Sequence, residues 1–386
     1  MKVSNRIPLR WGVLGATGFV AGPYRDEIRQ TPQDSQIVAL CARRRDRLQA
    51  AAKQDGAAFI SDDWRQVVQH PDVNGVLVAT PYCFHYEAVM ASAQSGKQVF
   101  CEKPVALDAQ QAYEMWEACH KAGVAHFVPF WTRYVPVFAR ARELVASGIL
   151  GDVRVVVYRW HNPRPPEMPF TWRDDADVSA GGTIADVGSH AYDTLRWILD
   201  DEARRVLAHT DVITDAKLDV GEINLREALD WGDPRDNAPA KPAARKRGTA
   251  PDYGQLAIEF QRGTVGIMVL SHAPVIRKGL APELELHGTA ASLAVHRLGS
   301  RLELAVGQQP PVVHEVLEDP GFGNRFAQHV IPALNAGPTT KPEQGQYPSL
   351  WDGWRVQVFT DAAARSARQG GWAHLADGDP GRNRLN

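Results

Sequence analysis

The stretch Trp11-Gly12-Val13-Leu14-Gly15-Ala16-Thr17-Gly18-Phe19-Val20-Ala21 decides the fold of this chain. Its first four residues predict a buried strand, and the segment 19–30 predicts the helix that follows. Glycine at such a turn lets backbone N–H groups approach a pyrophosphate, which the positive end of the helix dipole also favours. The spacing Gly15-x-x-Gly18-x-x-Ala21 differs from the common G-x-G-x-x-G, and glycines alone are also typical of an ordinary strand–helix turn. The position at the first turn of an α/β unit favours a dinucleotide site, with contacts from Gly15, Thr17, Gly18 and Phe19.

Short apolar runs alternate with longer amphipathic segments up to about residue 130. We expect strands at 11–14, 37–41, 75–79, 98–101 and 124–130, and helices at 19–30, 44–53, 64–68, 84–95 and 108–122. Ser61 is expected to cap the helix at 64–68. The strands are almost wholly apolar, which is typical of a parallel sheet covered by helices on both faces. The pattern predicts a doubly wound α/β domain over residues 1–130.

The pattern changes in the second domain, which we place at residues 131–386. Strands are expected at 153–160, 255–260, 264–271, 283–287, 292–296 and 301–305, with helices at 189–199 and, last, at about 350–368. Runs of strands with few helices predict an α+β domain around a large, mostly antiparallel open sheet. A Pro-rich segment at about 214–251, with the basic run 241–247, is expected to be a mobile surface insertion. Its charges either face water or contact a phosphate or a partner.

Charge and cysteine content limit the classes of function. The 386 residues include 43 Lys and Arg against 45 Asp and Glu, a net charge of −2 that gives no long-range attraction for nucleic acid or an anionic membrane. No run of 18 apolar residues is present, and the first residues lack the apolar core of a signal peptide. The four cysteines show no C-x-x-C spacing, which favours free thiols in a reducing compartment. We therefore expect a cytoplasmic protein.

The end of the second strand bears on the choice of cofactor. A site for NAD usually has an Asp or Glu there, whereas an Arg accommodates the 2′-phosphate of NADP. This chain has Cys41-Ala42-Arg43-Arg44-Arg45, with no carboxylate until Asp46. A guanidinium forms two hydrogen bonds with a phosphate, so we predict NADP, with NAD possible and with Arg43 and Arg44 as the contacts. The alternative is that these arginines only begin a surface helix.

Two later motifs carry groups suited to catalysis. Glu102-Lys103-Pro104 follows an expected strand, at the sheet edge where ligands of open α/β sheets bind. The stretch from Gly181 to Asp193 places Asp186 and His190 four residues apart at a helix start, so both can face one cavity. By itself such a pair is more typical of a salt bridge, and a zinc site would need a third ligand that the spacing does not offer, so no metal is expected. Cys101 is expected to be a buried strand cysteine.

Taken together, these motifs resemble the Gfo/Idh/MocA family of glucose–fructose oxidoreductase and inositol dehydrogenase proteins. The similarity extends over nearly the whole chain. It rests on Trp11-Gly12-Val13-Leu14-Gly15, Ala79-Thr80-Pro81 with His85, Glu102-Lys103-Pro104, Arg133-Tyr134-Val135-Pro136 and Gly181-Gly182 with Asp186-x-Gly188-x-His190-x-x-Asp193. The chain departs from the family pattern at Tyr82, where Asn is frequent, and in the glycine turn, which has one extra residue.

The resemblance implies a Rossmann domain and reversible hydride transfer between a nicotinamide and a carbinol carbon of a sugar, cyclitol or related polyol. It implies that Lys103, Asp186 and His190 line the substrate site, and that Thr80, Pro81, His85, Glu102 and Lys103 lie at the cofactor. His190 would be the general acid–base, because an imidazole titrates near neutral pH. Lys103 would stabilise the developing alkoxide, and Asp186 would hold a substrate hydroxyl. Further candidates for the pocket wall are Tyr134, Trp172, Arg173 and Tyr192.

Two other functions fit the same fold. One is a sensor of nucleotide or sugar without turnover, which has no need of Lys103 together with His190. The other is an enzyme that uses the nicotinamide transiently, for hydrolysis or epimerisation. The open sheet of the second domain would leave an apolar face uncovered, so we expect a homodimer or homotetramer.

Overall fold

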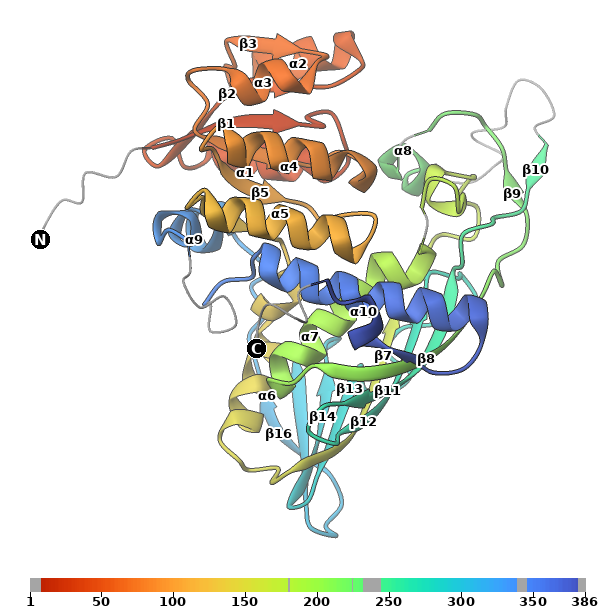
Figure 1. The fold of residues 1–386 in the computed structure, drawn as a ribbon. Helices are drawn as coiled ribbons and strands as arrows, with labels where there is room; N and C mark the ends of the chain where they lie inside the picture. Colours follow the sequence, from red (N-terminus) through yellow and green to blue (C-terminus); the bar gives the residue numbers. More distant parts are fainter. Residues whose placement is uncertain (1–7, 180, 224, 232–243, 339–345, 381–386) are drawn as a thin grey trace, which may run out of the picture. The chain divides into compact units, whose positions relative to one another are not determined.

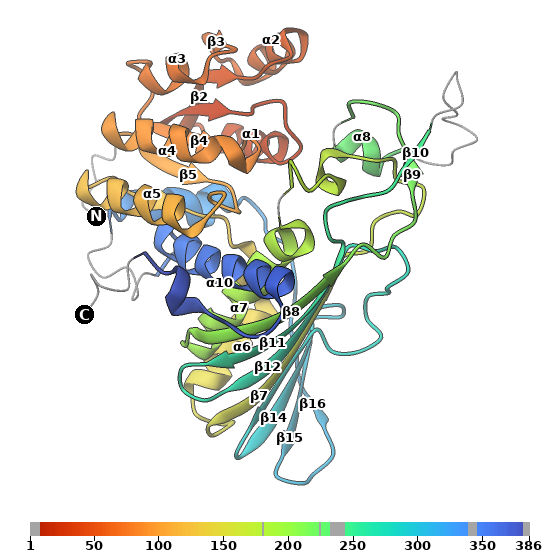
Figure 2. The same cartoon turned by 45° about the vertical axis from the view of Figure 1, so that its right-hand side comes forward.

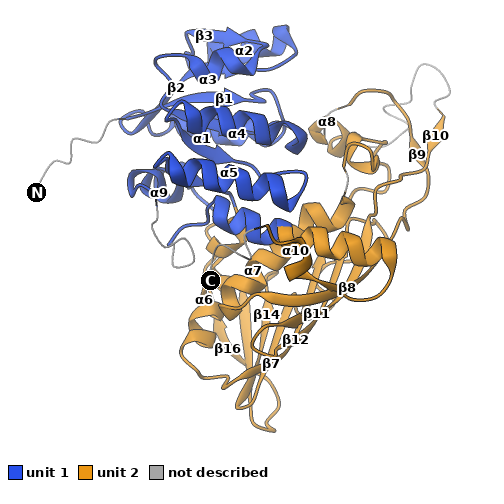
Figure 3. Cartoon of the chain, in the orientation of Figure 1, with its two compact units in different colours: residues 1–129, 322–357, 383–386 blue, residues 130–321, 358–382 orange. Residues whose placement is uncertain are grey.

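The computed structural model divides the chain into two compact units (Figure 3). It describes residues 8–179, 181–223, 225–231, 244–338 and 346–380. Unit 1 holds residues 1–129, 322–357 and 383–386, and unit 2 holds residues 130–321 and 358–382. The sequence analysis places 322–357 in the second domain, whereas the structure packs this segment with the N-terminal residues.

Unit 1 is built on a six-stranded parallel sheet in the order β3-β2-β1-β4-β5-β6 (Figure 1). Its strands are β1 (Leu9–Leu14), β2 (Ser35–Cys41), β3 (Phe59–Ser61), β4 (Gly75–Val78), β5 (Gln98–Cys101) and β6 (His126–Phe127). Trp11, Val13, Val76, Leu77 and Phe100 are fully buried, as the apolar pattern predicts for a sheet covered on both faces. The doubly wound α/β prediction is confirmed.

The helices of unit 1 connect these strands. They are α1 (Ala21–Arg29), α2 (Arg45–Asp55), α3 (Trp64–Gln69), the short 3₁₀ turn η1 (Tyr82–Phe84), α4 (His85–Gln94) and α5 (Ala109–Lys121). The expected cap of α3 is wrong by two residues, because Ser61 ends the unpredicted strand β3. The carboxylate of Asp63 accepts the Arg65 N–H instead.

The second segment of unit 1 packs against the helices α1 and α5 of the N-terminal segment. It contains the π-helical turn η5 (Phe326–Val330), α9 (Ile331–Asn335) and the first eight residues of α10 (Leu350–Gln369). The Phe326 ring lies 5.5–5.7 Å from the rings of Trp11, Tyr24 and Phe100. Arg325 forms an ion pair with Glu27 of α1. These contacts explain why the segment belongs with unit 1 despite its distance along the chain.

Unit 2 contains a nine-stranded sheet in the order β16-β15-β14-β13-β7-β12-β11-β8-β17 (Figure 2). The strands are β7 (Val153–His161), β8 (Ala203–Asp211), β11 (Tyr253–Phe260), β12 (Val265–Ser271), β13 (Leu284–Gly288), β14 (Ala291–His296), β15 (Arg301–Val306), β16 (Val312–Val316) and β17 (Ala373–His374). Only β7 and β12 pair in parallel. The predicted large, mostly antiparallel sheet is confirmed, although β8, β16 and β17 were not foreseen.

Helices cover one face of this sheet. They are α6 (Pro136–Ala146), α7 (Ser189–Leu199) and the second part of α10 (Figure 2). Strand residues alternate between the two faces, so Val156, Tyr158 and Met268 are fully buried while Val155 and Ile267 are exposed. The exposed face is therefore partly apolar.

The segment 214–251 contains more regular structure than a loop. Its described residues form the strand pair β9 (Lys217–Leu218) and β10 (Arg245–Lys246) and the helix α8 (Leu225–Leu229). Leu225 and Ala228 pack with Met168 in a small apolar cluster. The predicted mobility concerns a segment that lies partly outside the described residues. Residues 241–243 of the basic run also lie outside them. Among the described residues, no helix has the length and apolar character that a bilayer span requires.

Candidate functional site

Four motifs of unit 1 begin from one row of residues at the carboxyl edge of its sheet. The register aligns Leu14 of β1 with Cys41 of β2 and with Val78 of β4, and aligns Val78 with Cys101 of β5. The segments that start at Gly15, Ala42, Ala79 and Glu102 therefore leave the sheet side by side. Ligands of open α/β sheets bind at this edge, near the strands where the connections change direction.

The glycine turn has the backbone geometry that the sequence predicts. Gly15 has a φ of +75°, and a Cβ there would lie 2.5 Å from the carbonyl oxygen of Ala79. The N–H groups of Gly15 and Ala16 both bond to the Cys41 carbonyl at 3.0 Å. Thr17 is half-buried, and Gly18 and Phe19 are exposed just before α1 begins. A phosphate can approach this exposed turn and the N-terminus of α1 together.

Arg43 and Arg44 lie at the end of β2 with exposed side chains. Arg44 is the N-cap residue of α2, with extended backbone and no side-chain capping bond. No ion pair joins either arginine to another described residue. Both guanidinium groups are therefore accessible to an anion at the same sheet edge as the glycine turn.

His85 ties two of the motifs together from inside the unit. Its Nε2 lies 2.9 Å from the Thr80 carbonyl, and its Nδ1 lies 3.1 Å from the Pro104 carbonyl. The side chain is buried, and burial lowers the pKa of His85 to about 4. His85 is thus neutral at pH 7 and shapes the backbone of Thr80, Pro81 and Lys103. The position of His85 beside a cofactor stays a prediction.

Glu102 fixes the backbone at Lys103. Its Oε1 accepts a hydrogen bond from the Tyr24 hydroxyl at 2.6 Å, and its Oε2 accepts one from the Lys103 N–H at 3.0 Å. Burial raises the pKa of the Glu102 carboxyl, against the opposing effect of the nearby Lys103 ammonium. The Lys103–Pro104 peptide is cis, and the Lys103 side chain is half-buried. Glu102 therefore acts through its neighbours, and it is Lys103 that offers a charged group at the edge.

Cys101 is fully buried, as expected. Burial raises the pKa of its thiol well above the ordinary value, so the reactive thiolate is disfavoured.

In unit 2, glycines allow the turn that carries Asp186. Gly182 has a φ of +50°, and a Cβ on it would lie 2.2 Å from the Pro251 carbonyl oxygen. A Cβ on Gly188 would lie 2.9 Å from the Leu270 side chain. Between them the chain forms the wide π-helical turn η4 (Ile184–Gly188), which leads directly into α7. Wide turns of this kind are frequent at functional sites.

Asp186 is surrounded by cationic and imidazole groups that are distant in the sequence. Its Oδ2 forms an ion pair with Arg173, and it lies 3.5 Å from Arg164 Nη2 and 3.2 Å from His272 Nε2. Burial lowers the pKa of His272, which the adjacent Asp186 opposes. Burial, reinforced by Arg173, also lowers the pKa of Arg164. This neighbourhood favours an ionised Asp186, which accepts hydrogen bonds.

The sequence motif indicates Asp186 and His190, but no motif indicates Arg164 or His272. Arg173 and Asp186 line one pocket that also includes Ser179, Thr214 and Lys217, and their role toward a substrate stays a prediction. Asp186 and His190 occupy consecutive turns, η4 and α7. Neither Arg164 in a Pro-rich loop nor His272 after β12 had a local signal that marked it.

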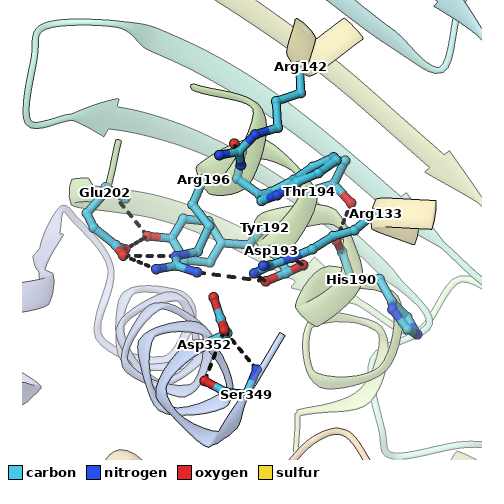
Figure 4. Close-up of polar contacts among 12 residues, drawn as sticks. Arg133, Arg142, His190, Tyr192, Asp193, Thr194, Arg196, Glu202, Ser349 and Asp352 are labelled. Atoms are coloured by element: carbon cyan, nitrogen blue, oxygen red, sulfur yellow. Dashed lines mark hydrogen bonds and ion pairs between the residues drawn. The ribbon is translucent and has the colours of Figure 1, made fainter. Parts of the chain in front are cut away.

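His190 lies among aromatic rings in the first turn of α7. Its ring stacks on Trp160 with a centroid distance of 5.5 Å and meets Phe130 edge-on at 6.2 Å. Its backbone carbonyl accepts the Thr194 hydroxyl at 2.8 Å (Figure 4). These neighbours fix the plane of the imidazole.

Tyr192 does not line a pocket, contrary to prediction. Its side chain is fully buried, its ring stacks on Phe359 at 3.8 Å, and its hydroxyl donates to Glu202 at 2.8 Å (Figure 4). The reason is helical geometry, because residues two apart on a helix face opposite sides. His190 and Tyr192 cannot both face one pocket.

The remaining pocket candidates lie in 3₁₀ turns of unit 2. Trp172 begins η3 (Trp172–Asp174), and the Arg173 guanidinium carbon lies 4.8 Å from its ring centroid. Tyr134 ends η2 (Trp131–Tyr134), is half-buried, and lies 6.0 Å from the Trp131 ring. Trp172 is thus beside the Asp186 cluster, while Tyr134 remains a prediction.

Two charged residues of the family-like motifs form a buried pair. Arg133 Nε and Nη2 donate to the two oxygens of Asp193 at 2.8 and 2.5 Å (Figure 4). Asp193 is fully buried and Arg133 nearly so. The pair joins η2 to α7 and so supports the helix that carries His190.

Comparison with known proteins decides the family. Residues 9–130 match the GFO_IDH_MocA family, described as "Oxidoreductase family, NAD-binding Rossmann fold", and residues 138–294 match the "GFO/IDH/MocA C-terminal domain". The chain belongs to the Gfo/Idh/MocA oxidoreductase family. It is thus an NAD(P)-binding oxidoreductase, and the predicted resemblance is confirmed.

Three curated relatives show the range within the Gfo/Idh/MocA family. Levoglucosan dehydrogenase of Pseudarthrobacter phenanthrenivorans is 25% identical over 349 residues, which cover 84% of this chain and 86% of that protein. D-glucoside 3-dehydrogenase of Escherichia coli is 32% identical over 53% of this chain and 58% of its own length. Myo-inositol 2-dehydrogenase of Thermotoga maritima is 30% identical over 54% and 60%. For the latter two, the matched region spans less than two thirds of the relative.

Solved structures of the family share the whole fold. An oxidoreductase domain protein from Kribbella flavida has a TM-score of 0.78 and 24% identity, with 95% of this chain and 99% of that chain covered. Levoglucosan dehydrogenase in complex with NADH and levoglucosan has a TM-score of 0.76 and 20% identity, with 96% and 100% covered. At these identities the likeness concerns the fold alone.

The residues of unit 1 fit a nicotinamide dinucleotide. The tight approach of Gly15 to Ala79 leaves no room for a side chain, and the turn at Gly18 is exposed just before the N-terminus of α1, which favours an anion. When bound, this cofactor supplies or accepts a hydride. No group of three or more metal-ligating side chains occurs within the described ranges.

Proposed function

We propose that this Gfo/Idh/MocA protein is an NADP-preferring dehydrogenase or reductase that acts on a CH–OH group of a sugar, cyclitol or related polyol. The observation that carries the proposal is the strand-end row Leu14, Val78 and Cys101, from which the nucleotide turn and Lys103 both leave the sheet. A nicotinamide dinucleotide bound at the glycine turn would then have the Lys103 ammonium group near its nicotinamide ring. Relatives named for levoglucosan, glucosides and inositols support a polyol substrate.

In this proposal three side chains of the chain share the work. Lys103 donates a hydrogen bond to the reacting oxygen and stabilises alkoxide charge. His190, held between Trp160 and Phe130, takes or returns the hydroxyl proton. The Asp186 carboxylate, which lies among Arg164, Arg173 and His272, accepts a hydrogen bond from a substrate hydroxyl. A sensor without turnover would need neither Lys103 nor His190, which makes that alternative the weaker one.

The decisive experiment is a screen of sugars, cyclitols and their keto forms with NADP and NADPH, followed at the nicotinamide absorbance. Substrate-dependent net reduction of NADP supports the dehydrogenase. Product formation from a sugar without net change in the nicotinamide would instead favour the transient use of the cofactor in hydrolysis or epimerisation. Binding of cofactor and sugar without any product would favour the sensor.

The cofactor preference gives a separate prediction. Because Arg43 and Arg44 are exposed at the end of β2, NADP should bind at least about tenfold more tightly than NAD. Replacing both with alanine should remove this advantage and leave the affinity for NAD nearly unchanged. Lys53→Ala, at the far end of α2, is the control with the same loss of charge per residue. Equal binding of both cofactors by the unaltered protein, measured by tryptophan fluorescence, contradicts the preference.

We also propose that the protein is a homodimer or homotetramer that pairs through the open face of the unit 2 sheet. The register sets Val155 beside Val265 and Val157 beside Ile267, followed by Ala257 and Leu207. Ile267 is 52% exposed at the centre of this row. Such a contiguous apolar face on a folded chain is typical of an interface.

The four free cysteines are consistent with a reducing, cytoplasmic setting.

Ile267→Lys should therefore shift the mass of the particle toward the monomer, because it buries an unpaired charge in the interface. Light scattering after size-exclusion chromatography measures the mass. Ile149→Lys, at another exposed isoleucine of unit 2, should leave the mass unchanged. A monomeric unaltered protein at micromolar concentration would refute the proposal.

A further inference from the structure

A second cavity of unit 2 lies outside the Asp186 pocket. Its walls come from the end of β7, from the loop 274–283 and from the turn between β14 and β15. The volume is about 370 Å³. Pockets of this size hold small molecules. None of the residues assigned above to cofactor or substrate lines this cavity.

The lining is strongly cationic. Five guanidinium or ammonium groups face the cavity, from Arg159, Arg277, Lys278, Arg297 and Arg301, and Glu283 is its carboxylate. Three of the five cations meet carboxylates: Arg159 pairs with Glu285, Arg297 with Glu283, and Arg301 with Glu303.

Arg277 and Lys278 differ from these three cations. Among the described residues, Arg277 donates to the Pro274 carbonyl at 2.7 Å, and Lys278 donates to Asn162 Oδ1 at 3.0 Å. Both hydrogen-bond partners are neutral oxygens, and neither cation forms an ion pair with a carboxylate of the described residues. Partial burial and the neighbouring Arg297 lower the pKa of Lys278, against the opposing effect of the Glu283 carboxylate. His161, also in the lining, has a buried Nδ1 for which the described residues provide no hydrogen-bond partner.

We propose that this cationic cavity binds the phosphate group of a small molecule. A phosphate monoester carries a charge of about −2 near neutral pH, which matches Arg277 and Lys278, the two cations of the lining that form no ion pair with a described residue. Arginine and lysine together provide the charge-assisted donors that such a group prefers. The apolar side chains of Val275, Ile276 and Leu298 in the same lining contact the carbon skeleton of the ligand.

The cavity is connected to the proposed acid–base residue through one aromatic ring. The Arg297 guanidinium carbon lies 5.4 Å from the Trp160 ring centroid, and Trp160 stacks on His190. A phosphate that draws Arg297 toward itself changes the surroundings of Trp160.

The experiment uses the full chain without nicotinamide, titrated with inorganic phosphate and with glucose 6-phosphate in calorimetry. Chloride keeps the ionic strength constant, and glucose is the neutral control. We expect saturable binding of both phosphates to one site. The double variant Arg277→Gln, Lys278→Gln should bind at least about tenfold more weakly, because it loses two charge-assisted hydrogen bonds. Both side chains are exposed, so folding should be unaffected.

Arg262→Gln is the matched control, since Arg262 is exposed in unit 2 and does not line the cavity. It should bind phosphate like the unaltered protein. Equal binding by the double variant would overturn the proposal, because the phosphate would then occupy another site such as the nucleotide turn. Absence of saturable binding at millimolar phosphate would also overturn it.

Discussion

Lys103→Met should lower kcat by about 100- to 1,000-fold and leave the affinity for NADP within a few-fold of the unaltered protein. The loss is that of one preorganised donor at the developing alkoxide. Cofactor binding should persist, because the glycine turn and the backbone that Glu102 holds remain in place. Methionine keeps an unbranched side chain that is one atom shorter, and it removes the charge and the donors. Steady-state kinetics with the substrate found by the screen, together with a fluorescence titration of NADP, measures both quantities.

Lys121→Met provides the control for this prediction. Lys121 ends α5 of the same unit with a side chain that is 68% exposed, and among the described residues it pairs with Glu117 one turn earlier. The kcat of the Lys121→Met variant should equal that of the unaltered protein. If Lys103→Met keeps more than a tenth of the activity, another group stabilises the reacting oxygen, and the assignment of Lys103 is wrong. If NADP binding is lost as well, Lys103 serves the cofactor more than the reaction.

The α/β part of the fold could be predicted because its information is local. Buried parallel strands such as Gly75–Val78 are continuous apolar runs, and the glycine turn follows directly from the first of them. Strand β8 was missed because Arg204 and Arg205 interrupt its apolar residues. In the structure both arginines pair with Glu259 on the neighbouring strand, a partner that is 54 or 55 residues away. Charged residues of this kind favour the prediction of a loop, because the sequence does not show which strand pairs with them.

Some residues of the candidate site could likewise be predicted from local motifs, and others could not. Asp186, His190 and Lys103 occur in short motifs, so the sequence alone marks them. Arg164 and His272 reach Asp186 from segments 22 residues earlier and 86 residues later, and only the packing of the sheet brings them there. Tyr192 is a different case, since the helical period already places it opposite His190, and the prediction neglected this rule.

The segment 322–357 shows why domain boundaries are harder than elements. Its final helix was predicted almost to the residue, but α10 contributes to both units. Phe326 reaches the unit 1 core only because Trp11, Tyr24 and Phe100 surround it, and no local pattern encodes that contact.

Asp193→Ala should lower the free energy of unfolding by about 3–5 kcal/mol. The carboxylate is fully buried, binds two nitrogens of Arg133 and lies 3.8 Å from Arg196 Nη1, so its removal takes a negative charge away from two guanidinium groups. The guanidinium carbon of Arg133 also lies 5.8 Å from the Trp197 ring, which contributes far less than the carboxylate does. Urea denaturation followed by tryptophan fluorescence measures the change. Because α7 carries both Asp193 and His190, Asp193→Ala also disturbs His190. A loss of activity in this variant therefore does not assign a catalytic role to Asp193.

The double variant Arg133→Met, Asp193→Leu separates charge from shape. Replacing a buried pair by apolar groups of similar volume is often neutral, so this variant should recover most of the stability that Asp193→Ala loses. Asp152→Ala, which removes an exposed carboxylate paired with Arg154, should cost no more than about 1 kcal/mol. Should Asp193→Ala prove as mild as Asp152→Ala, water or another group must replace the missing carboxylate, and the pair does not hold α7 in place. Recovery of activity by the double variant would assign Asp193 to the support of His190, because leucine can neither accept a proton nor bind a hydroxyl.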